Sequence, residues 1–151
     1  MGMAELSREL GSNVGYMVWR LSMRWRAAMD QALDPLGLTQ AQYSVLAPLY
    51  GMTRSDGPGP SQRELADATG LDVIYVSKLV RALERAGLVS RRAHPADPRA
   101  IELTLTPEGI TTAKRALPVV RKLRDELTAS LGGNDGAETA QLAALLRSLL
   151  E

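Results

Sequence analysis

Apolar residues recur at every third or fourth position over several long stretches of this chain, and this spacing predicts a mainly helical fold. From about residue 4 to residue 33 the pattern predicts one long helix with an apolar stripe along one side. The residues of this stripe are Leu6, Leu10, Val14, Met17, Leu21, Trp25 and Ala28. Asp34-Pro35 and Gly37 should end the helix, because proline disfavours helical geometry in the residue before it and glycine permits a turn.

A second helix should begin after Thr39, since Thr39 and Gln42 have the spacing of a capping box. Pro48 lies inside its apolar pattern and lacks a backbone N–H, so we expect it to bend this helix or end it early. Residues 51–60 are rich in Gly, Pro, Ser and Asp, and this composition predicts a loop longer than a tight turn requires.

The stretch 62–99 has the spacing of a helix-turn-helix followed by a basic β-hairpin. The residues that fit this spacing are Leu65, Ala66, Gly70, Leu71, Val76 and Leu79. A small residue such as Ala66 lets two helices cross closely, and Gly70 allows the positive φ that the turn requires. Ser61 and Glu64 form another capping box, which should start the first helix of the motif.

Asp72 is the expected N-cap of the second helix of the motif, and Gly87 should end that helix. Two strands are expected next, at residues 88–93 and 100–105. Residues 101–105 read Ile-Glu-Leu-Thr-Leu, an alternation that predicts a half-buried strand with its apolar side chains facing the core.

Thr106-Pro107-Glu108 combines a cap, a first-turn proline and an acid, so it should start a further helix. We expect this helix to run to about residue 130 with a bend near Pro118. A glycine-rich linker at 132–136 then leads to a final amphipathic helix. The apolar residues of this last helix are Leu142, Leu145, Leu146 and Leu149.

The 151 residues carry a formal net charge of only +1, but the charge is unevenly distributed. Residues 72–99 include six basic and three acidic residues, whereas the rest of the chain has 12 basic and 14 acidic residues. A basic stripe on a nearly neutral chain is typical of a protein that meets phosphates with one face, although ordinary surface charge could produce the same excess. The chain has no cysteine and one histidine, which excludes disulfides and thiolate metal sites.

Several motifs together make the chain similar to the MarR family of bacterial winged-helix regulators. They are Val76-Ser-Lys-Leu-Val-Arg-Ala-Leu-Glu-Arg-Ala-Gly-Leu-Val89, Asp97-Pro-Arg99, Leu103-Thr-Leu-Thr-Pro-Glu-Gly109 and Leu38-Thr-x-x-Gln-Tyr-x-x-Leu46. The resemblance covers nearly the whole chain, and the Asp-x-Arg wing tip followed by Leu-x-Leu-Thr-x-x-Gly is highly specific. One departure is the Gly- and Pro-rich loop before Ser61, which lies where the family often has a short strand.

The fold class expected is mainly α with a small β-hairpin wing. A winged helix-turn-helix domain should occupy residues 35–106, and residues 1–34 and 107–151 should form a helical dimerisation region. The first helix and the last two carry more apolar surface than one chain can cover, so we expect a two-fold homodimer. Packing of these helices on one another within a monomer is the alternative.

The second helix of the motif should lie in the major groove of DNA, because its other side packs on the core. The residues expected to project outward are Tyr75, Ser77, Lys78 and Arg81. Lys78 and Arg81 can contact guanine edges or phosphates, and Ser77 can bond to either. Tyr75 could touch a thymine methyl group or a phosphate. Solvation without DNA contact is the alternative for Arg81 and the favoured interpretation for Arg85.

Phosphate contacts are expected on both sides of this helix. The start of the preceding helix can hold a phosphate through its free N–H groups, although Ser61 could equally serve as a cap alone. The residues at that start are Ser61, Gln62 and Arg63. The resemblance implies that Arg99 enters a minor groove while the Asp97 carboxylate orients its guanidinium, with a salt bridge that only stiffens the hairpin as the alternative. Further contacts to the DNA backbone are expected from Arg91, Arg92 and His94.

Families of this kind often sense a small-molecule effector in a crevice between the dimer helices and the DNA-binding lobe. The candidates to line such a crevice here are Trp19, Met23, Trp25 and Tyr43. Core packing is the stronger interpretation of aromatic and Met residues at helical spacing. Arg20 and Arg24, one turn apart, could meet an anionic ligand but fit a solvated surface or a dimer seam equally well.

The sequence therefore predicts a cytoplasmic, homodimeric, DNA-binding transcriptional regulator, favouring a ligand-responsive repressor of a pseudo-palindromic operator. The first ten residues lack the apolar core of a signal peptide, and no apolar run reaches membrane-spanning length. No metal, cofactor or catalytic site is expected. The main alternative is a winged helix used only for protein–protein contact, which has no need of a basic wing. An enzyme would require a separate cofactor domain, for which no length remains.

Overall fold

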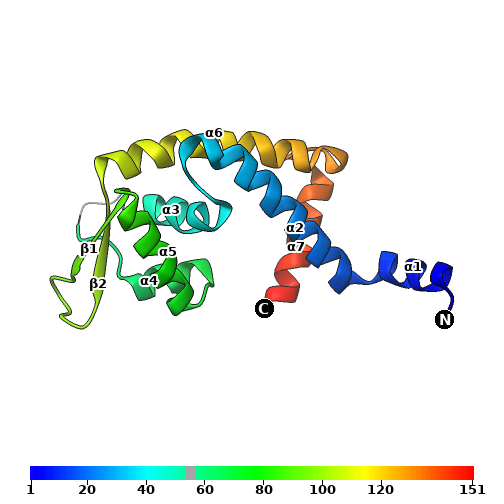
Figure 1. Cartoon of the computed structure of the whole chain (residues 1–151), viewed down its shortest axis with the longest axis horizontal. Coiled ribbons are helices and arrows are strands. Elements are labelled where there is room, and N and C mark those ends of the chain that lie inside the picture. The colour runs from blue at the N-terminus through cyan, green and yellow to red at the C-terminus, as the bar shows by residue number, and fades with distance from the viewer. Residues whose placement is uncertain (54–56) are drawn as a thin grey trace. The chain divides into compact units, whose positions relative to one another are not determined.

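The computed structural model describes residues 1–53 and 57–151 of the chain. Residue contacts divide the chain into two compact units. The first unit combines Met1–Ala32 with Leu123–Glu151, and the second is Leu33–Lys122. Figure 1 shows the helices and the single hairpin of which these units are built. In the described part of the chain, no helix is long and apolar enough to cross a bilayer.

The second unit has the order of a winged helix-turn-helix. It opens with a short 3-10 helix at Asp34–Leu36, which ends at Gly37 with a φ of 71° as the sequence indicates. The elements that follow are α3 (Gln40–Met52), α4 (Gln62–Thr69), α5 (Val73–Arg85), β1 (Val89–Ala93), β2 (Ile101–Leu105) and the first part of α6 (Pro107–Leu127). The predicted boundaries of both motif helices and both strands are confirmed to within one or two residues.

The predicted local signals fix the helix-turn-helix. Both capping boxes form, Thr39 with Gln42 at α3 and Ser61 with Glu64 at α4. Gly70 adopts a φ of 69° between α4 and α5, a left-handed conformation that a side chain would strain. The turn therefore brings α5 back across α4, and the two helices contact each other as well as α3.

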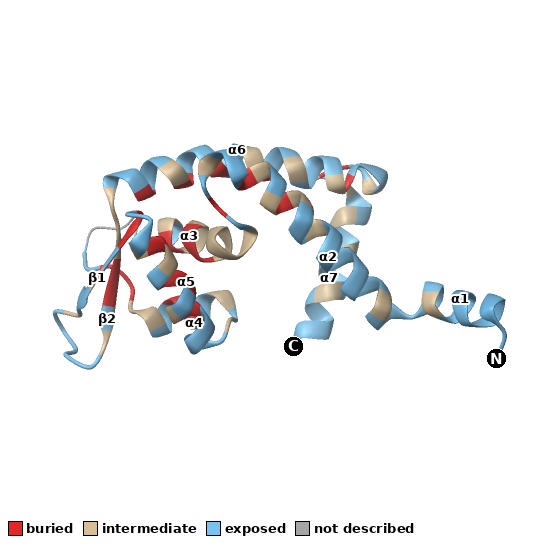
Figure 2. Cartoon of the chain, viewed as in Figure 1, coloured by how far each residue is buried: buried red, intermediate tan, exposed pale blue. Residues whose placement is uncertain are grey.

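The core of this unit lies among α3, α4, α5 and the two strands, as the buried residues in Figure 2 show. Its largest fully buried apolar side chains are Leu33, Val45, Leu46, Leu49, Leu65, Val76, Val80, Leu83 and Leu103. The four apolar residues predicted to turn α5 inward are all buried: Val76, Leu79, Val80 and Leu83. Since a fully buried Leu or Val stabilises a fold by about 1.5–3 kcal/mol, this packing fixes which side of α5 stays free.

Strands β1 and β2 pair antiparallel, with Val89 opposite Leu105 and Ala93 opposite Ile101. The predicted alternation in β2 is wrong at its first two positions, since Ile101 is exposed and Glu102 is fully buried. Glu102 faces inward because a backbone N–H and an arginine on β1 satisfy its carboxylate there.

The segment before α4 runs beside β2. A single bridge joins Ser61 to Glu102, and the Leu103 N–H donates to the Pro60 carbonyl at 2.9 Å. The predicted loop at 51–60 is thus partly wrong, because α3 extends through Met52 and the residues nearest α4 join the sheet as a one-residue bridge. Residues 54–56 of that prediction lie outside the described residues.

Two helix predictions need correction. The single helix predicted at 4–33 is two helices, α1 (Met3–Ser12) and α2 (Val14–Leu33), because Asn13 leaves helical geometry between them. The Asn13 side chain accepts the Tyr16 N–H at 2.9 Å and so starts α2. Helix α3 does not end early at Pro48 but continues to Met52, held by buried Val45, Leu46 and Leu49.

The first unit contains α1, α2, the end of α6, a 3-10 turn at Ala129–Leu131 and α7 (Ala137–Leu150). Helix α6 runs through Pro118 and ends three residues before the predicted position. An apolar groove of about 500 Å³ lies between α2 and α7. Its lining residues are Val14, Met17, Val18, Leu21, Leu142, Leu145, Leu146, Ser148 and Leu149. Leu145 and Leu149 are 60% and 69% exposed, so the predicted apolar stripes are present but mostly uncovered in one chain.

Candidate nucleic-acid interface

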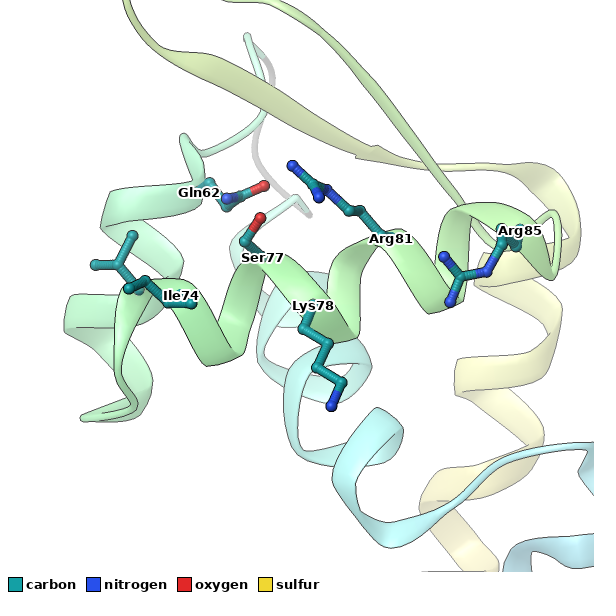
Figure 3. A pocket seen from close by; sticks show the side chains of 7 residues that line it. Gln62, Ile74, Ser77, Lys78, Arg81 and Arg85 are labelled. Carbon is teal, nitrogen blue, oxygen red and sulfur yellow. The ribbon is translucent and has the colours of Figure 1, made fainter.

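The outer face of α5 carries a groove of about 670 Å³. Its lining residues are Gln62, Val73, Ile74, Ser77, Lys78, Arg81 and Arg85. Figure 3 shows Ser77 and Arg81 on α5 facing Gln62 of α4, with Lys78 and Arg85 also projecting from α5. The predicted outward residues Ser77, Lys78 and Arg81 are thus brought together, whereas Tyr75 is exposed outside this lining.

The cations of this groove are unpaired. Within the described residues, Lys78, Arg81 and Arg85 make no ion pair and no side-chain hydrogen bond. Glu84, the acid nearest in sequence to Arg81 and Arg85, pairs instead with Arg91 at 3.2 Å, and the Asp72 carboxylate accepts the N–H groups of Ile74 and Tyr75 at the start of α5. The groove therefore presents uncompensated positive charge, which is what a phosphate or a guanine edge attracts.

Sequence reasoning did not assign Ile74 or Val73 to the site. Ile74 is 81% exposed and Val73 is 40% exposed, and both line the groove. The sequence contained a signal for Ile74, because this apolar residue does not share the helical spacing of the buried apolar residues of α5 and should therefore be exposed. Arg85, interpreted from sequence as merely solvated, lines the same groove.

A second hollow of about 620 Å³ joins the start of α4 to the wing. Its lining residues are Ser61, Gln62, Arg63, Val73, Asp97, Arg99, Ala100 and Ile101. Gln62 and Val73 belong to both hollows, so the two form one continuous face. The Oε1 atom of Gln62 is buried without a hydrogen-bond partner among the described residues, although its side chain is only half-buried.

The wing tip is ordered by its own backbone contacts. The Asp97 carboxylate accepts the backbone N–H of Arg99 at 2.9 Å, and the Ala100 N–H donates to the Asp97 carbonyl. The predicted contact between the Asp97 carboxylate and the Arg99 guanidinium is not formed, because this carboxylate closes the turn instead. His94 also acts within the loop, since its Nδ1 accepts the Ala96 N–H at 3.1 Å. Arg99 is exposed and makes no side-chain contact within the described residues.

The cations of β1 differ from those of α5 because both are paired. Arg91 Nε lies 3.2 Å from Glu84 Oε1, and Arg92 Nε lies 2.6 Å from Glu102 Oε2. We predicted that these arginines contact the DNA backbone, and the structure shows that each also forms an ion pair within the protein. The side chain of Arg92 is still 66% exposed, so it can meet a phosphate while it holds Glu102.

Two carboxylates of this face titrate below their usual range. The hydrogen bond from Arg92, followed by that from the Gly59 N–H, lowers the pKa of Glu102 and outweighs the opposing effect of burial. The same bond raises the pKa of Arg92. At the start of α4, the N–H of Ser61 and then its hydroxyl lower the pKa of Glu64. Both carboxylates are therefore charged at neutral pH.

Comparison with known proteins identifies the family. Residues 36–100 match the model of the MarR family. The HTH-type transcriptional repressor Rv2887 of Mycobacterium tuberculosis is 37% identical over 108 residues, which cover 72% of this chain and 74% of that relative. This chain belongs to the MarR family.

Solved MarR-like structures in complex with DNA have the same fold. The transcriptional repressor CouR bound to a 23-mer DNA duplex is 32% identical, with a TM-score of 0.80 over 95% of this chain and 96% of that one. The Staphylococcus aureus MepR–DNA complex is 27% identical, with a TM-score of 0.79 over 91% of this chain and 96% of that one. This MarR-family chain is accordingly a DNA-binding transcriptional regulator and not an enzyme.

The predicted effector residues do not form one site within either unit. Trp19 and Met23 belong to the first unit and are more than half exposed, whereas Tyr43 is a half-buried residue of α3 in the second unit. Trp19 stacks obliquely on Tyr16 at 5.9 Å, and the Arg20 guanidinium lies 5.9 Å from the same Tyr16 ring. An effector crevice therefore stays a prediction. Within the described residues, no cluster of acidic or histidine side chains could hold a metal ion.

Proposed function

We propose that this MarR-family regulator is a repressor that binds a pseudo-palindromic operator as a homodimer. The observation that carries the proposal is the groove on α5, where Lys78, Arg81 and Arg85 lie beside polar Ser77 and make no ion pair with any residue that the structure describes. Free cations on the outer face of a motif helix suit the major groove, where they can meet guanine edges and phosphates. Rv2887 and CouR are both named as repressors, which supports repression rather than activation by this protein.

The first turn of α5 has a distinct role in this proposal. Ile74 is apolar and 81% exposed, and the Asp72 carboxylate already occupies the N–H groups at this end of the helix. An anionic cap disfavours a phosphate at this end, so the first turn should meet base edges. The methyl group of thymine is the apolar feature of the major groove, and Ile74 is the side chain suited to contact it.

The start of α4 and the wing hold the DNA on either side of α5. The Ser61 hydroxyl accepts the Glu64 N–H and also bonds to the Glu64 carboxylate, so a phosphate contact by Ser61 would have to replace that second bond, and exposed Arg63 beside it can meet the same phosphate. Arg99 enters a minor groove from the wing, with the turn that Asp97 closes setting its direction. The further wing cations, Arg91, Arg92 and His94, add contacts to the DNA backbone.

A second copy of the chain is the proposed occupant of the apolar groove between α2 and α7. Eight of its nine lining residues are apolar, and an exposed continuous patch of this kind favours association. A two-fold pair would present two α5 helices to half-sites about 34 Å apart. Action on chromosomal DNA would place this dimer in the cytoplasm.

A small-molecule effector would act through this dimer. It would relieve repression by binding more tightly to a dimer geometry in which the two α5 helices no longer match the half-sites. Trp19, Met23 and Tyr43 remain the candidates for its contacts.

Fluorescence anisotropy tests the proposal directly. The protein is titrated onto labelled DNA from upstream of its own gene and onto a scrambled duplex, over a series of salt concentrations. Tighter binding to the native duplex, weakening steeply with salt, is expected. Unchanged sequence-specific binding by the Lys78→Ala, Arg99→Ala double variant would overturn the assigned mode of DNA recognition. No binding to either duplex at low salt would favour the protein-contact module.

A further inference from the structure

Glu102 is a fully buried carboxylate on the face that we assign to DNA, yet it cannot contact DNA itself. It lies on β2, three residues after Arg99 at the wing tip. A buried charge is costly unless it is paired and hydrogen-bonded, so its position needs an explanation beyond packing.

The carboxylate of Glu102 joins three segments of the chain. Arg92 of β1 donates to it through Nε at 2.6 Å and through Nη2 at 3.4 Å. The backbone N–H of Gly59, 43 residues away in sequence, donates to Oε1 at 2.7 Å. Both strands of the wing and the segment that leads into α4 are thus bonded to one side chain.

We call the contacts of Glu102 with Arg92 and Gly59 the junction, and backbone contacts reinforce it. Gly59 lies so close to β2 that a Cβ atom there would stand 2.0 Å from the Leu103 carbonyl oxygen, so only glycine fits. The next residues continue the contact, through the bond from the Leu103 N–H to the Pro60 carbonyl and the bridge between Ser61 and Glu102. Ser61 is also the N-cap of α4, so the junction ends where that helix begins.

We propose that Glu102 is a positioning residue that fixes the wing against the start of α4 and thereby holds Arg99 at its DNA contact. The hollow lined by Arg63 and Arg99 lies between the start of α4 and the wing tip, next to these contacts, so its width depends on the angle between the wing and α4. The inference rests on the proposed function, because it concerns the wing contact assigned there.

The positioning role and a simple charge effect predict opposite changes in DNA affinity when Glu102 is neutralised, which makes the inference testable. Removal of a negative charge near a polyanion strengthens binding when charge alone matters, and it also releases Arg92. If Glu102 positions the wing, its neutralisation weakens binding although the protein becomes more positive.

The principal variant is Glu102→Gln. The glutamine oxygen can still accept the Gly59 N–H, while the charge that holds Arg92 is removed. Because the Arg92 side chain is 66% exposed, it can turn to solvent without leaving a buried unpaired charge. We expect about tenfold weaker binding to the operator, with folding checked by thermal denaturation.

Glu84→Gln is the matched control. Glu84 pairs with Arg91, the neighbour of Arg92 on β1, but it is 39% exposed and lies on α5. Its neutralisation removes the same charge without touching the junction, so affinity should change by about twofold or less and in the direction of tighter binding. Equal weakening by both variants would overturn the positioning role.

A double-mutant cycle with Arg99→Ala completes the test. Arg99→Ala should weaken operator binding clearly in the wild-type protein and much less in the Glu102→Gln background. Equal effects in both backgrounds overturn this inference alone, whereas no effect of Arg99→Ala in either background overturns the proposed wing contact as well. Should Glu102→Gln not fold, Arg92→Lys replaces it, because lysine keeps the charge but not the forked contact. If Arg99→Ala weakens operator binding as much in the Arg92→Lys background as in the wild-type protein, the inference is overturned.

Discussion

A single chain leaves two surfaces open, and they differ in chemistry. The groove between α2 and α7 is almost entirely apolar, whereas the groove on α5 is lined by three cations that have no ion-pair partner in the described part of the chain. An apolar face gains free energy when it leaves water, and salt does little to weaken it. A cationic face gains mostly by releasing counterions from a polyanion, and salt weakens it steeply. The two surfaces are therefore suited to different partners: DNA for the cationic groove and, as we propose, a second copy of the chain for the apolar groove.

The largest effect is expected from breaking the apolar surface. Leu145→Glu together with Leu149→Glu places charges in the groove between α2 and α7, which a second copy could cover only at a high desolvation cost. The chain should become monomeric, and operator affinity should fall by about 100-fold or more because the two half-sites are no longer bound together. Analytical ultracentrifugation and anisotropy measure the two consequences.

Ala143→Glu on the same helix is the control for this pair. Ala143 is exposed and does not line the groove, so the dimer and the operator affinity should both persist. A dimer that survives the paired leucine substitutions would show that the apolar surface has another role.

The next largest effect is expected from the cationic surface. Lys78→Ala together with Arg81→Ala should weaken operator binding by about 10- to 100-fold and reduce the slope of log affinity against log salt by about two. The dimer should persist, since neither residue lies in the apolar groove. Anisotropy over a salt series measures both quantities, and an unchanged salt slope would contradict contact of these cations with phosphate.

The helix-turn-helix could be predicted from sequence because its signals are local. Capping residues, a glycine turn and an apolar stripe act within a few positions of one another, and Ser61, Gly70 and Val76 all behave as predicted. The break at Asn13 was missed because the apolar stripe continues across it while the asparagine caps a new helix.

The buried position of Glu102 could not be predicted in the same way. Alternation along β2 places a glutamate outside, and an inward carboxylate becomes favourable only with Arg92 on the paired strand and the Gly59 N–H, 43 residues away, as its hydrogen-bond donors. Residues whose partners are distant in sequence, as those of Glu102 are, need the tertiary structure. The position of the Arg99 guanidinium was missed for a different reason, since the turn at the wing tip lets the Asp97 carboxylate accept the backbone N–H of Arg99.

A smaller effect is expected at Ile74, which brings an apolar side chain into the cationic surface. Ile74→Ala should weaken operator binding by about fourfold, the effect expected if one methyl-sized group of Ile74 packs on a thymine methyl group, since a buried CH₂ contributes about 0.8 kcal/mol. Replacing single thymidines of the operator by deoxyuridine removes the thymine methyl group that Ile74 would contact. One such replacement should weaken operator binding by the wild-type protein and leave operator binding by Ile74→Ala unaffected. Equal sensitivity of wild type and Ile74→Ala at every thymine would exclude this contact.

The smallest effect is expected from lowering the pH. Protonation of Glu102 should weaken its contact with Arg92 beside the cationic surface. The pKa of Glu102 is lowered from 4.5, chiefly by Arg92 and then by the Gly59 N–H, with nearby His94 acting in the same direction. A carboxyl group with a lowered folded-state pKa stabilises the fold fully above its ordinary value, and this contribution disappears as pH falls through the folded-state value. The amide resonance of Gly59 should therefore stay constant from pH 7 to about pH 5 and titrate with a midpoint below 4.5. In Glu102→Gln this titration should disappear, whereas a wild-type midpoint at or above 4.5 would show that Arg92 does not hold the carboxylate in solution.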